Sequence, residues 1–244
     1  MNERRVALVT GGAKGIGRAI VLALAKEGFS IAVNYKTSEK EALALVSELQ
    51  SKGVNAIAVQ ADLSKMDEVK KMHETLKGYF GFVDTLINNA GVSLIKPLYE
   101  CTEKDYDAVM DNNLRSAFNT CSVFSPDMVS NGFGRIVNIA SIWGERGASS
   151  EVLYSTSKAG LIGLTKALNA ELAINGVIVN SVSPGMIDTD MNAHLSKEET
   201  DEFLLGVSLG RVGKPTEVAS VVELLTRKEL YIAGENISVN GGML

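Results

Sequence analysis

The sequence predicts an α/β protein built on a doubly wound parallel sheet of about seven strands, with helices on both faces. Short runs rich in β-branched residues alternate along the chain with amphipathic segments of helical length. Such alternation is typical of strands joined by helical crossovers, and strands joined in this way run parallel in one covered sheet. A length of 244 residues suits one large domain of this kind as well as two small ones.

The first half of the chain supplies four expected strands and three expected helices. Gly28 and Gly53 mark the ends of the first two helices, because glycine is preferred just after a helix ends. Ser38 and Glu41 form the Ser-x-x-Glu pattern of a capping box at the start of the second helix. The expected strands cover 5–9, 30–35, 55–63 and 83–91, and the expected helices cover 17–28, 38–53 and about 65–78.

The second half repeats this alternation with longer helices. The expected helices cover about 103–129, 154–176 and about 215–226, and the expected strands cover 134–141, 177–185 and 236–242. The irregular region is 186–209, which is polar with a few apolar residues at helical spacing, and we expect a mobile lid there. No repeat, low-complexity segment or linker interrupts the pattern, so we expect a single domain over 1–244.

Composition and charge exclude several classes of function. The net charge of −5 disfavours general binding to nucleic acid or anionic membranes, since both need a basic face. The N-terminus runs directly into a strand without a signal-peptide core, and no apolar run approaches the roughly 18 residues that span a bilayer. Cys101 and Cys121 lack metal-ligand spacing and are expected to be reduced thiols. We therefore expect a cytoplasmic protein with no metal site and no nucleic-acid or membrane partner.

The first expected strand leads into a glycine-rich turn, TGGAKGIG at 10–17. Its glycines allow a tight turn and a close approach of a pyrophosphate, and the following helix points its first amides at that phosphate. The spacing is wider than GxGxxG, and a purely structural glycine turn is the alternative. The strand–turn–helix context favours a dinucleotide site, with cofactor contacts expected from Gly11, Lys14, Gly15, Ile16 and Gly17.

The end of the second expected strand bears on which nicotinamide cofactor binds. A site that prefers NAD usually carries an acidic residue there for the ribose 2′-hydroxyl. This chain has Asn34 and Tyr35 followed by Lys36, and Lys14 lies in the glycine turn. Two cations without a carboxylate suit a 2′-phosphate, so we expect NADP(H) rather than NAD; two solvated lysines are the alternative.

Two further turns follow expected strands at the same sheet edge. Asp62, with Leu63 beside it, is placed to accept a hydrogen bond from the adenine amino group, and a helix cap or turn aspartate is the alternative. The NNAG turn at 88–91 ends the fourth strand, and parallel sheets bind ligands at the carboxyl ends of their strands. We expect Asn89, Ala90 and Gly91 beside the cofactor, with an ordinary Asn-Gly turn as the competing interpretation.

A tyrosine and a lysine begin the helix after the fifth expected strand. Tyr154 and Lys158 are four residues apart and therefore share one helix face. A free phenol titrates near 10, and a nearby ammonium lowers its pKa toward the range useful in acid–base catalysis. Ser141, at the carboxyl end of the strand, is placed to hydrogen-bond the same substrate oxygen. A Tyr-x-x-x-Lys pair is common on its own, but its combination with the glycine turn, the NNAG turn and Ser141 predicts a catalytic site.

The segments TGGAKGIG, NNAG, SIWG…YSTSK and SPG follow one another in the order typical of the short-chain dehydrogenase/reductases, which the whole chain resembles. The resemblance is closest to the 3-oxoacyl-[acyl-carrier-protein] reductases, through YSTSKAGLIGLTKALNAEL, GRVGKPTEVAS and SVNGGM. It implies a single NAD(P)-binding Rossmann-type domain that assembles into a homotetramer.

The resemblance also implies a catalytic set of four residues, here Asn113, Ser141, Tyr154 and Lys158. In the family the tyrosine donates the proton, the serine orients the carbonyl, and the lysine binds the ribose hydroxyls and tunes the tyrosine. The asparagine holds a water that links the lysine to solvent. Tyr154 and Lys158 therefore also count as cofactor contacts. The segment PGMIDT resembles the one that brackets the nicotinamide amide, which adds Pro184, Gly185, Ile187 and Thr189 to those contacts.

Two stretches depart from the family pattern. The reductases often carry basic residues near the active-site mouth to dock an acidic carrier, but the matching positions near Asn131, Gly132 and Asn175 are neutral. Arg115 and Arg146 remain as candidate contacts for a phosphopantetheine arm or a carrier.

The loop before the catalytic tyrosine, WGERGASSEVL, is the second departure. It holds Trp143, Glu145 and Glu151 where a blander loop is common. A pocket tryptophan and carboxylate suit an aromatic or polar substrate, and simple packing of Trp143 under the lid is the alternative. His73 and His194 have no partner motif and are expected to be ordinary residues.

Together these features predict an NADPH-dependent ketoreductase. It is expected to reduce a 3-oxoacyl thioester, carried by an acyl carrier protein or coenzyme A, to the 3-hydroxyacyl thioester. The alternative is the same chemistry on a polyketide, an aromatic ketone, or a small ketone or secondary alcohol. A non-enzymatic NADP-binding subunit is the less favoured class, because it has no reason to keep all four catalytic positions.

Overall fold

Seven strands form one parallel sheet in the described part of the computed structural model, which comprises residues 5–192 and 195–243. The strand order is β3-β2-β1-β4-β5-β6-β7, and each neighbouring pair runs parallel. The strands are β1 Val6–Val9, β2 Ser30–Tyr35, β3 Ala56–Gln60, β4 Thr85–Asn88, β5 Gly134–Ile139, β6 Val177–Pro184 and β7 Asn236–Val239. The predicted doubly wound parallel sheet is therefore confirmed.

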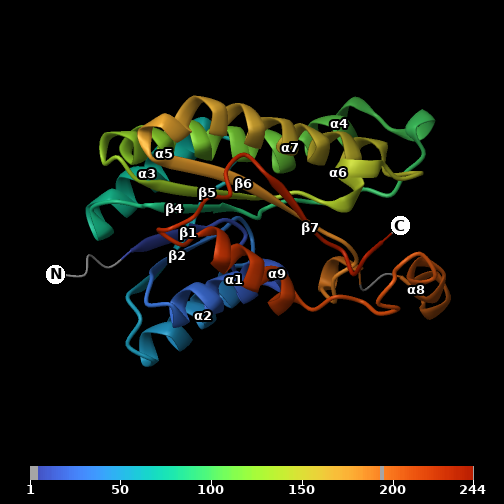
Figure 1. The fold of residues 1–244 in the computed structure, drawn as a ribbon, viewed down its shortest axis with the longest axis horizontal. Helices are drawn as coiled ribbons and strands as arrows, with labels where there is room; N and C mark the ends of the chain where they lie inside the picture. The colour runs from blue at the N-terminus through green and yellow to red at the C-terminus, as the bar shows by residue number, and fades with distance from the viewer. Residues whose placement is uncertain (1–4, 193–194, 244) are drawn as a thin grey trace.

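Helices α1, α2 and α9 cover one face of this sheet (Figure 1). They span Gly15–Lys26, Glu39–Ser51 and Pro215–Leu225. Their apolar sides pack against the sheet in one core cluster, in which Ile20, Leu24 and Val222 are fully buried. Because the opposite face is covered as well, β1 and β2 are buried along their whole length.

Helices α3, α5 and α7 cover the other face (Figure 1) and span Met66–Phe80, Ser116–Ser130 and Val152–Leu172. A second core cluster lies beneath them and includes the buried side chains of Leu86, Phe124 and Met128. The shorter elements are α4 Glu103–Met110, α6 Ile142–Arg146, α8 Lys197–Leu204 and the 3₁₀ turns η1 Leu98–Glu100, η3 Ala173–Asn175 and η4 Asp190–Asn192.

The carboxyl ends of the strands form the edge where a ligand crevice is expected. The sheet is built outward in both directions from β1 and β4, which are neighbours at its centre. In such sheets the crevice opens where the strand order reverses, at the carboxyl ends of the strands. Figure 1 shows α6 and α8 at this same end of the molecule.

The single long helix expected over 103–129 is interrupted in the structure. α4 ends at Met110, a π-helical turn, η2, spans Asp111–Arg115, and α5 follows from Ser116. The turn contains Asn113, whose side chain bonds to both main-chain groups of Val92. Apolar residues continue through the break, so the sequence pattern alone does not reveal it. Such π turns occur frequently at functional sites.

The capping box expected at the start of α2 does not form. Ser38 is the N-cap residue, but its side chain makes no capping hydrogen bond. Glu41 pairs instead with Lys14 of the glycine turn, with 2.7 Å between Nζ and Oε1. A cation from the first strand-to-helix turn has thus replaced the local backbone partner that the pattern predicts.

Two arginines fasten the amino edge of the sheet. Arg135, the second residue of β5, is buried and donates hydrogen bonds to the main-chain oxygens of Arg227 at 3.0 Å and Lys228 at 2.7 Å. Burial lowers the pKa of its guanidinium to about 10. Arg5 forms a 2.9 Å ion pair with Asp84, the residue before β4. The ends of several elements are therefore joined at this edge.

Within the described ranges, no helix has both the length and the apolar character needed to cross a membrane. The same residues contain no group of three or more potential ligands arranged to hold a metal ion. Cys101 and Cys121 are free thiols, and burial raises the pKa of Cys121 to about 12.

Candidate active site

The glycine-rich turn leaves its backbone open to a ligand. Gly11 and Gly15 have φ angles of +58° and +51°, a region that favours glycine. A Cβ on Gly17 would lie 2.5 Å from the carbonyl oxygen of Gly11, so only a hydrogen fits there. α1 begins at Gly15 and has no acidic residue in its first turn. The start of α1 therefore presents unpaired amides without opposing charge, which suits a pyrophosphate.

Ser141, Tyr154 and Lys158 come together at the carboxyl end of β5. Ser141 is the N-cap of α6, and its Oγ accepts a 3.2 Å hydrogen bond from the amide of Trp143. Tyr154 and Lys158 lie near the start of α7 and are both buried, with Lys158 Nζ 5.7 Å from the centroid of the tyrosine ring. The same Nζ donates to the carbonyl oxygen of Ile139 at 2.8 Å, which ties α7 to the last residue of β5, two residues before Ser141.

Two glycines permit the close packing around Lys158. A Cβ on Gly144 would lie 2.7 Å from the carbonyl carbon of Lys158, so α6 rests directly on the backbone of α7. A Cβ on Gly91 would lie 3.0 Å from Asn113 Oδ1 and 3.4 Å from Lys158 Nζ. The NNAG turn therefore packs against both Asn113 and Lys158, and the four predicted catalytic residues lie in one neighbourhood.

The pKa of Tyr154 moves in the direction opposite to that expected from the sequence. Burial raises it, a hydrogen bond with Ser141 lowers it, and the negative charge of Glu151 raises it further. Lys158 was expected to lower it, but its ammonium is bound to a main-chain oxygen, and burial lowers its own pKa to about 8. A raised pKa keeps the phenol protonated near neutral pH, which is the form that can donate a proton.

A cavity of about 450 Å³ lies over these residues at the carboxyl edge of the sheet. The glycine turn lines one part of it, and α8 with the segment before it lines another. Asn113 supports the wall from behind, through its packing on Gly91. The predicted site residues that line this cavity are Gly11, Lys14, Gly15, Ile16, Gly17, Asn89, Ala90, Gly91, Ser141, Tyr154, Lys158, Pro184, Gly185, Ile187 and Thr189.

A second cavity of about 230 Å³ adjoins the first, and Gly11, Lys14, Ala90 and Gly91 line both. The predicted residues that line the second cavity are Asn34, Tyr35, Lys36, Asp62 and Leu63. The two cavities together form an extended site along the carboxyl edge, a location and a shape that fit a dinucleotide.

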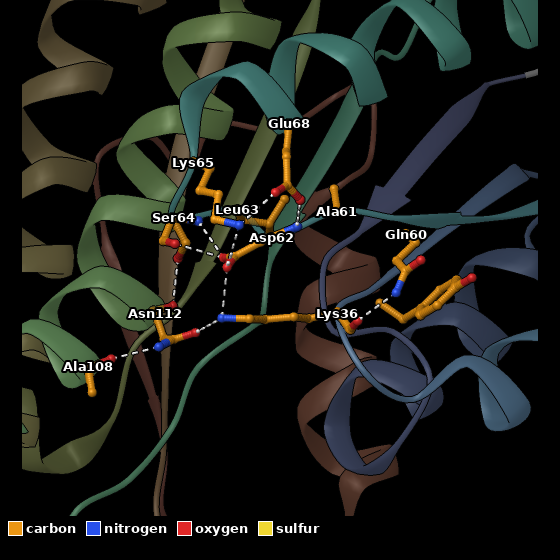
Figure 2. A network of polar contacts seen from close by, with 12 residues as sticks. Lys36, Gln60, Ala61, Asp62, Leu63, Ser64, Lys65, Glu68, Ala108 and Asn112 are labelled. Carbon is orange, nitrogen blue, oxygen red and sulfur yellow. Dashed lines mark hydrogen bonds and ion pairs between the residues drawn. The ribbon is translucent and has the colours of Figure 1, made fainter.

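The side chain of Lys36 extends from the end of β2 toward the turn after β3 and toward the π turn η2 (Figure 2). Its Nζ lies 3.0 Å from Asp62 Oδ2 and 3.4 Å from Asn112 Oδ1. Asp62 also accepts hydrogen bonds from the amide and hydroxyl of Ser64, so the turn role considered for it is present. Hydrogen bonds and the charge of Lys36 lower the pKa of Asp62 despite its partial burial.

Both cations expected to receive a 2′-phosphate therefore have carboxylate partners, Lys14 with Glu41 and Lys36 with Asp62. No carboxylate stands at the end of β2 in the sequence, as the prediction assumed. The two carboxylates that pair with the lysines come from other elements, because Glu41 lies on α2 and Asp62 follows β3, and only the folded chain brings them together.

Aromatic and apolar side chains form the wall of the larger cavity near α8. The rings of Trp143 and Phe203 meet edge to face, with centroids 5.9 Å apart and planes at 84°. This contact agrees with packing of the tryptophan beneath the expected lid. In the sequence, this wall is indicated by the helical spacing of apolar residues in 186–209. The lining residues that sequence reasoning did not single out include Ser93, Ile95, Met191, Leu195, Glu199 and Phe203.

The neutral positions considered for carrier docking do not lie near this cavity. Asn131 and Gly132 precede β5, and Asn175 precedes β6, so all three lie at the amino edge of the sheet, opposite Ser141. The expectation that they border the active-site mouth of this chain is wrong. α5 and α7 run antiparallel to the strands they precede, which carries their C-terminal ends to the far edge.

The remaining singled-out residues have ordinary local partners. Arg115 pairs with Asp111 at 2.6 Å, and Arg146 donates to the main-chain oxygen of Met243 at 2.8 Å. His73 lies 3.0 Å from Asp127, between α3 and α5. His194 lies outside the described residues.

This fold and this site define a nicotinamide-dependent oxidoreductase of alcohols and ketones. The family model for short chain dehydrogenases matches residues 5–200, and the chain belongs to that family.

Among known proteins, the chain is similar to the 3-oxoacyl-[acyl-carrier-protein] reductase FabG of Staphylococcus epidermidis, with 44% identity over 238 residues that cover 97% of this chain and 98% of the relative. The 3-oxoacyl-[acyl-carrier-protein] reductase of Synechocystis is 41% identical over 242 residues, which cover 98% and 97% of the two chains. A solved structure, of a putative gluconate dehydrogenase from Agrobacterium tumefaciens, superposes with a TM-score of 0.95. It is 35% identical, and the match covers 98% of this chain and 95% of the other.

Proposed function

We propose that the chain reduces 3-oxoacyl thioesters to 3-hydroxyacyl thioesters with NADPH, and that Tyr154 is the general acid. The observation that carries this proposal is the convergence of Ser141, Tyr154 and Lys158 on a cavity that the glycine turn also lines. The reductases of Staphylococcus and Synechocystis, similar along almost the whole chain, are named for this reaction. The acyl group would arrive on an acyl carrier protein or on coenzyme A.

The residues present fit a nicotinamide dinucleotide. The glycine turn would hold the pyrophosphate at the start of α1, where a Cβ on Gly17 would collide with the backbone. Asp62 and Leu63 would border the adenine, and Pro184 and Gly185 the nicotinamide. The bound cofactor supplies the hydride that adds to the carbonyl carbon.

The side chains of the site would bind and protonate the carbonyl oxygen of the substrate. Ser141 Oγ donates a hydrogen bond that orients it, and Tyr154 Oη transfers a proton to it, leaving a hydroxyl on the product and a phenolate on the enzyme. The positive charge of Lys158 stabilises that phenolate as it forms. Asn113 would hold a water through which Lys158 and Tyr154 are reprotonated.

The cavity wall favours an uncharged ketone over a sugar acid such as gluconate, for which the Agrobacterium protein is named. A bound carboxylate needs a cationic partner, most often the planar fork of arginine. No arginine occurs among the described residues that line the larger cavity, and its two lysines, Lys14 and Lys158, are already bound to Glu41 and to the Ile139 carbonyl oxygen. Glu151, Asp190 and Glu199 contribute carboxylates to the same lining. A 3-oxoacyl thioester carries no charge near its ketone and avoids this repulsion.

We also propose that 1–244 act as one cytoplasmic domain, with 186–209 as its lid, and that the chain forms a homotetramer. Two aromatic side chains support the assembly, because Tyr106 on α4 and Phe118 on α5 are 49% and 53% exposed and would be covered by another copy. Size-exclusion chromatography with light scattering measures the assembly. A species of 26.0 kDa would show that the chain works as a monomer.

Replacement of the phenol tests the proposed reaction. Tyr154→Phe is expected to lower kcat for acetoacetyl thioester reduction by about 100-fold or more, because the general acid is lost, while NADPH fluorescence still reports cofactor binding. Tyr231→Phe is the matched control, since Tyr231 is fully exposed and outside both cavities. A Tyr154→Phe enzyme with a tenth of the wild-type rate would overturn the assigned role.

A further inference from the structure

Trp143 and Phe203 meet in the wall of the larger cavity. Trp143 lies on α6, two residues after Ser141, and Phe203 lies on α8. Their rings are in edge-to-face contact, and both line the cavity. α8 contains no buried residue, and Phe203 is the apolar residue of this helix among those that line the cavity.

Other residues that line the larger cavity are exposed to solvent. Ile95, in the loop after the NNAG turn, and Met191, in η4, line the same cavity and are 53% and 44% exposed. Their exposure marks a mouth through which a ligand can extend into solvent. The cavity therefore has a mouth bordered by Ile95 and Met191 and a wall formed by the two rings.

The chemistry of a 3-oxoacyl thioester determines which part of it can face the wall. Two arms leave its ketone carbon. The thioester arm continues into pantetheine and a carrier, so it has to pass out through the mouth. The acyl tail is the arm that ends, and it is therefore the arm that a closed wall can accept.

We propose that the Trp143–Phe203 pair is a size filter that makes the enzyme selective for short 3-oxoacyl tails, with the four-carbon acetoacetyl group preferred. This inference rests on the proposed function. A short tail ends before the rings, whereas a longer tail has to separate them. Close-packed side chains lose their mutual contacts when they are separated. Separation of the two rings therefore weakens the binding of a longer tail.

The experiment measures kcat/KM with NADPH for coenzyme A thioesters whose 3-oxoacyl groups have four, six, eight and twelve carbons. In the wild-type enzyme we expect the value to fall by about tenfold or more between four and eight carbons, the scale at which apolar pockets discriminate size. Trp143→Leu and Phe203→Leu open the wall from its two sides, and each should lower the four-to-eight preference by about tenfold. Leu205→Ala, at a residue that is 88% exposed just after α8, is the control and should leave the preference unchanged.

The same length series as ethyl 3-oxoesters separates this inference from the proposed function. If the enzyme reduces no thioester, but reduces the esters with the length preference and loses that preference in the variants, the filter is supported and the thioester function is overturned. A flat or rising length profile in the wild-type enzyme would overturn the filter while leaving the reductase function intact. A preference that survives in both leucine variants, each shown to bind NADPH, would overturn the filter too. The wild-type length profile tests the filter even where one variant does not fold.

Discussion

Glu151, the N-cap residue of α7, acts through its charge on the phenol of Tyr154, the proposed general acid. That charge is one of the causes that raise the pKa of Tyr154. Glu151→Gln removes the charge, so the pKa of the phenol falls toward its ordinary value near 10. Ketone reduction needs the protonated phenol, and the alkaline limb of the kcat/KM profile should therefore move to lower pH.

The control for this shift is Glu199→Gln. Glu199 lines the same cavity, but its charge is not among the causes of the Tyr154 shift, and glutamine can keep the capping box at the start of α8. Its alkaline limb should coincide with that of the wild-type enzyme. An alkaline limb that stays in place in Glu151→Gln, or moves upward, would show that this carboxylate does not tune the phenol.

Glu41 is expected to weaken the preference for NADPH, because it holds one of the two cations proposed to receive the 2′-phosphate. Its hydrogen bond and charge raise the pKa of Lys14. Glu41→Gln frees Lys14, and KM for NADPH should fall by about two- to fivefold, the scale of exposed charge pairs, while KM for NADH changes little. Glu48→Gln on the same helix is the control, because Glu48 pairs with Arg18 outside both cavities.

Steady-state kinetics with NADPH and with NADH measure the effect of Glu41→Gln. Lys36→Asp should change the cofactor preference in the opposite direction. The aspartate repels a 2′-phosphate and can accept a hydrogen bond from a free ribose hydroxyl, so the NADPH to NADH ratio of kcat/KM should fall. Equal ratios in the wild-type, Glu41→Gln and Lys36→Asp enzymes would mean that the 2′-phosphate binds elsewhere.

The positions of the proposed catalytic residues were predictable because each follows a local rule. Ser141 follows the end of β5, Tyr154 and Lys158 lie near the start of α7, and parallel strands bring such ends to one edge. The charge partners were not predictable in the same way. Glu41 matches a capping pattern, and only the fold shows that it pairs with Lys14 at 2.7 Å and that the Ser38 side chain makes no capping bond.

At the scale of elements, the π turn between α4 and α5 positions Asn113. Its Oδ1 accepts from the Val92 amide at 2.7 Å, and its Nδ2 donates to the Val92 oxygen and to Ser157 Oγ, both at 2.9 Å. Asn113→Ala removes all three bonds, so the main-chain groups of Val92 lose these partners, while Ser157 Oγ keeps its bond to the Tyr154 oxygen. We expect a loss of about 2 kcal/mol in the free energy of unfolding and a melting temperature lower by roughly 5 °C.

Asn112→Ala is the neighbouring control for this prediction, with melting followed by circular dichroism for both variants. The Asn112 side chain bonds to Ala108 and Lys36 in the exposed part of the same turn, so its loss should cost less than about 1 kcal/mol. Equal destabilisation of the two variants would contradict the role given to the buried amide.

The existence of the elements was more predictable than their continuity. All seven strands follow from β-branched runs, because both faces of the sheet are covered and such strands read as continuous apolar segments. The break at η2 could not be predicted, because apolar residues at helical spacing run through it. It depends on Val92, which is distant in sequence and supplies the partners that hold Asn113.

At the scale of the whole molecule, charge placement bears on carrier docking. The neutral Asn131, Gly132 and Asn175 lie at the amino edge and add no attraction for an acidic carrier. We expect kcat/KM for an acetoacetyl group on carrier protein and on coenzyme A to agree within about threefold, with little change between low and moderate salt, because steering by surface charge is what salt screens.

Arg115→Ala and Arg146→Ala complete this comparison, since both arginines are exposed and were candidates for docking. A strong carrier preference that disappears with salt and is lost in either variant would assign docking to that arginine. The same preference surviving in both variants would place the docking charge at other residues.

The fastening of the amino edge by Arg135 and Arg5 implies that the molecule opens from one side. Partly buried hydrogen bonds join the start of β5 to the chain after α9, whereas the opposite edge includes α8, which contains no buried residue. Amide hydrogens beside Arg135 should therefore exchange with solvent deuterium only when the whole chain unfolds, and those of α8 through local opening. Exchange followed by mass spectrometry would then show a gradient from slow to fast across the sheet, so that substrates can enter and leave while the folded core persists.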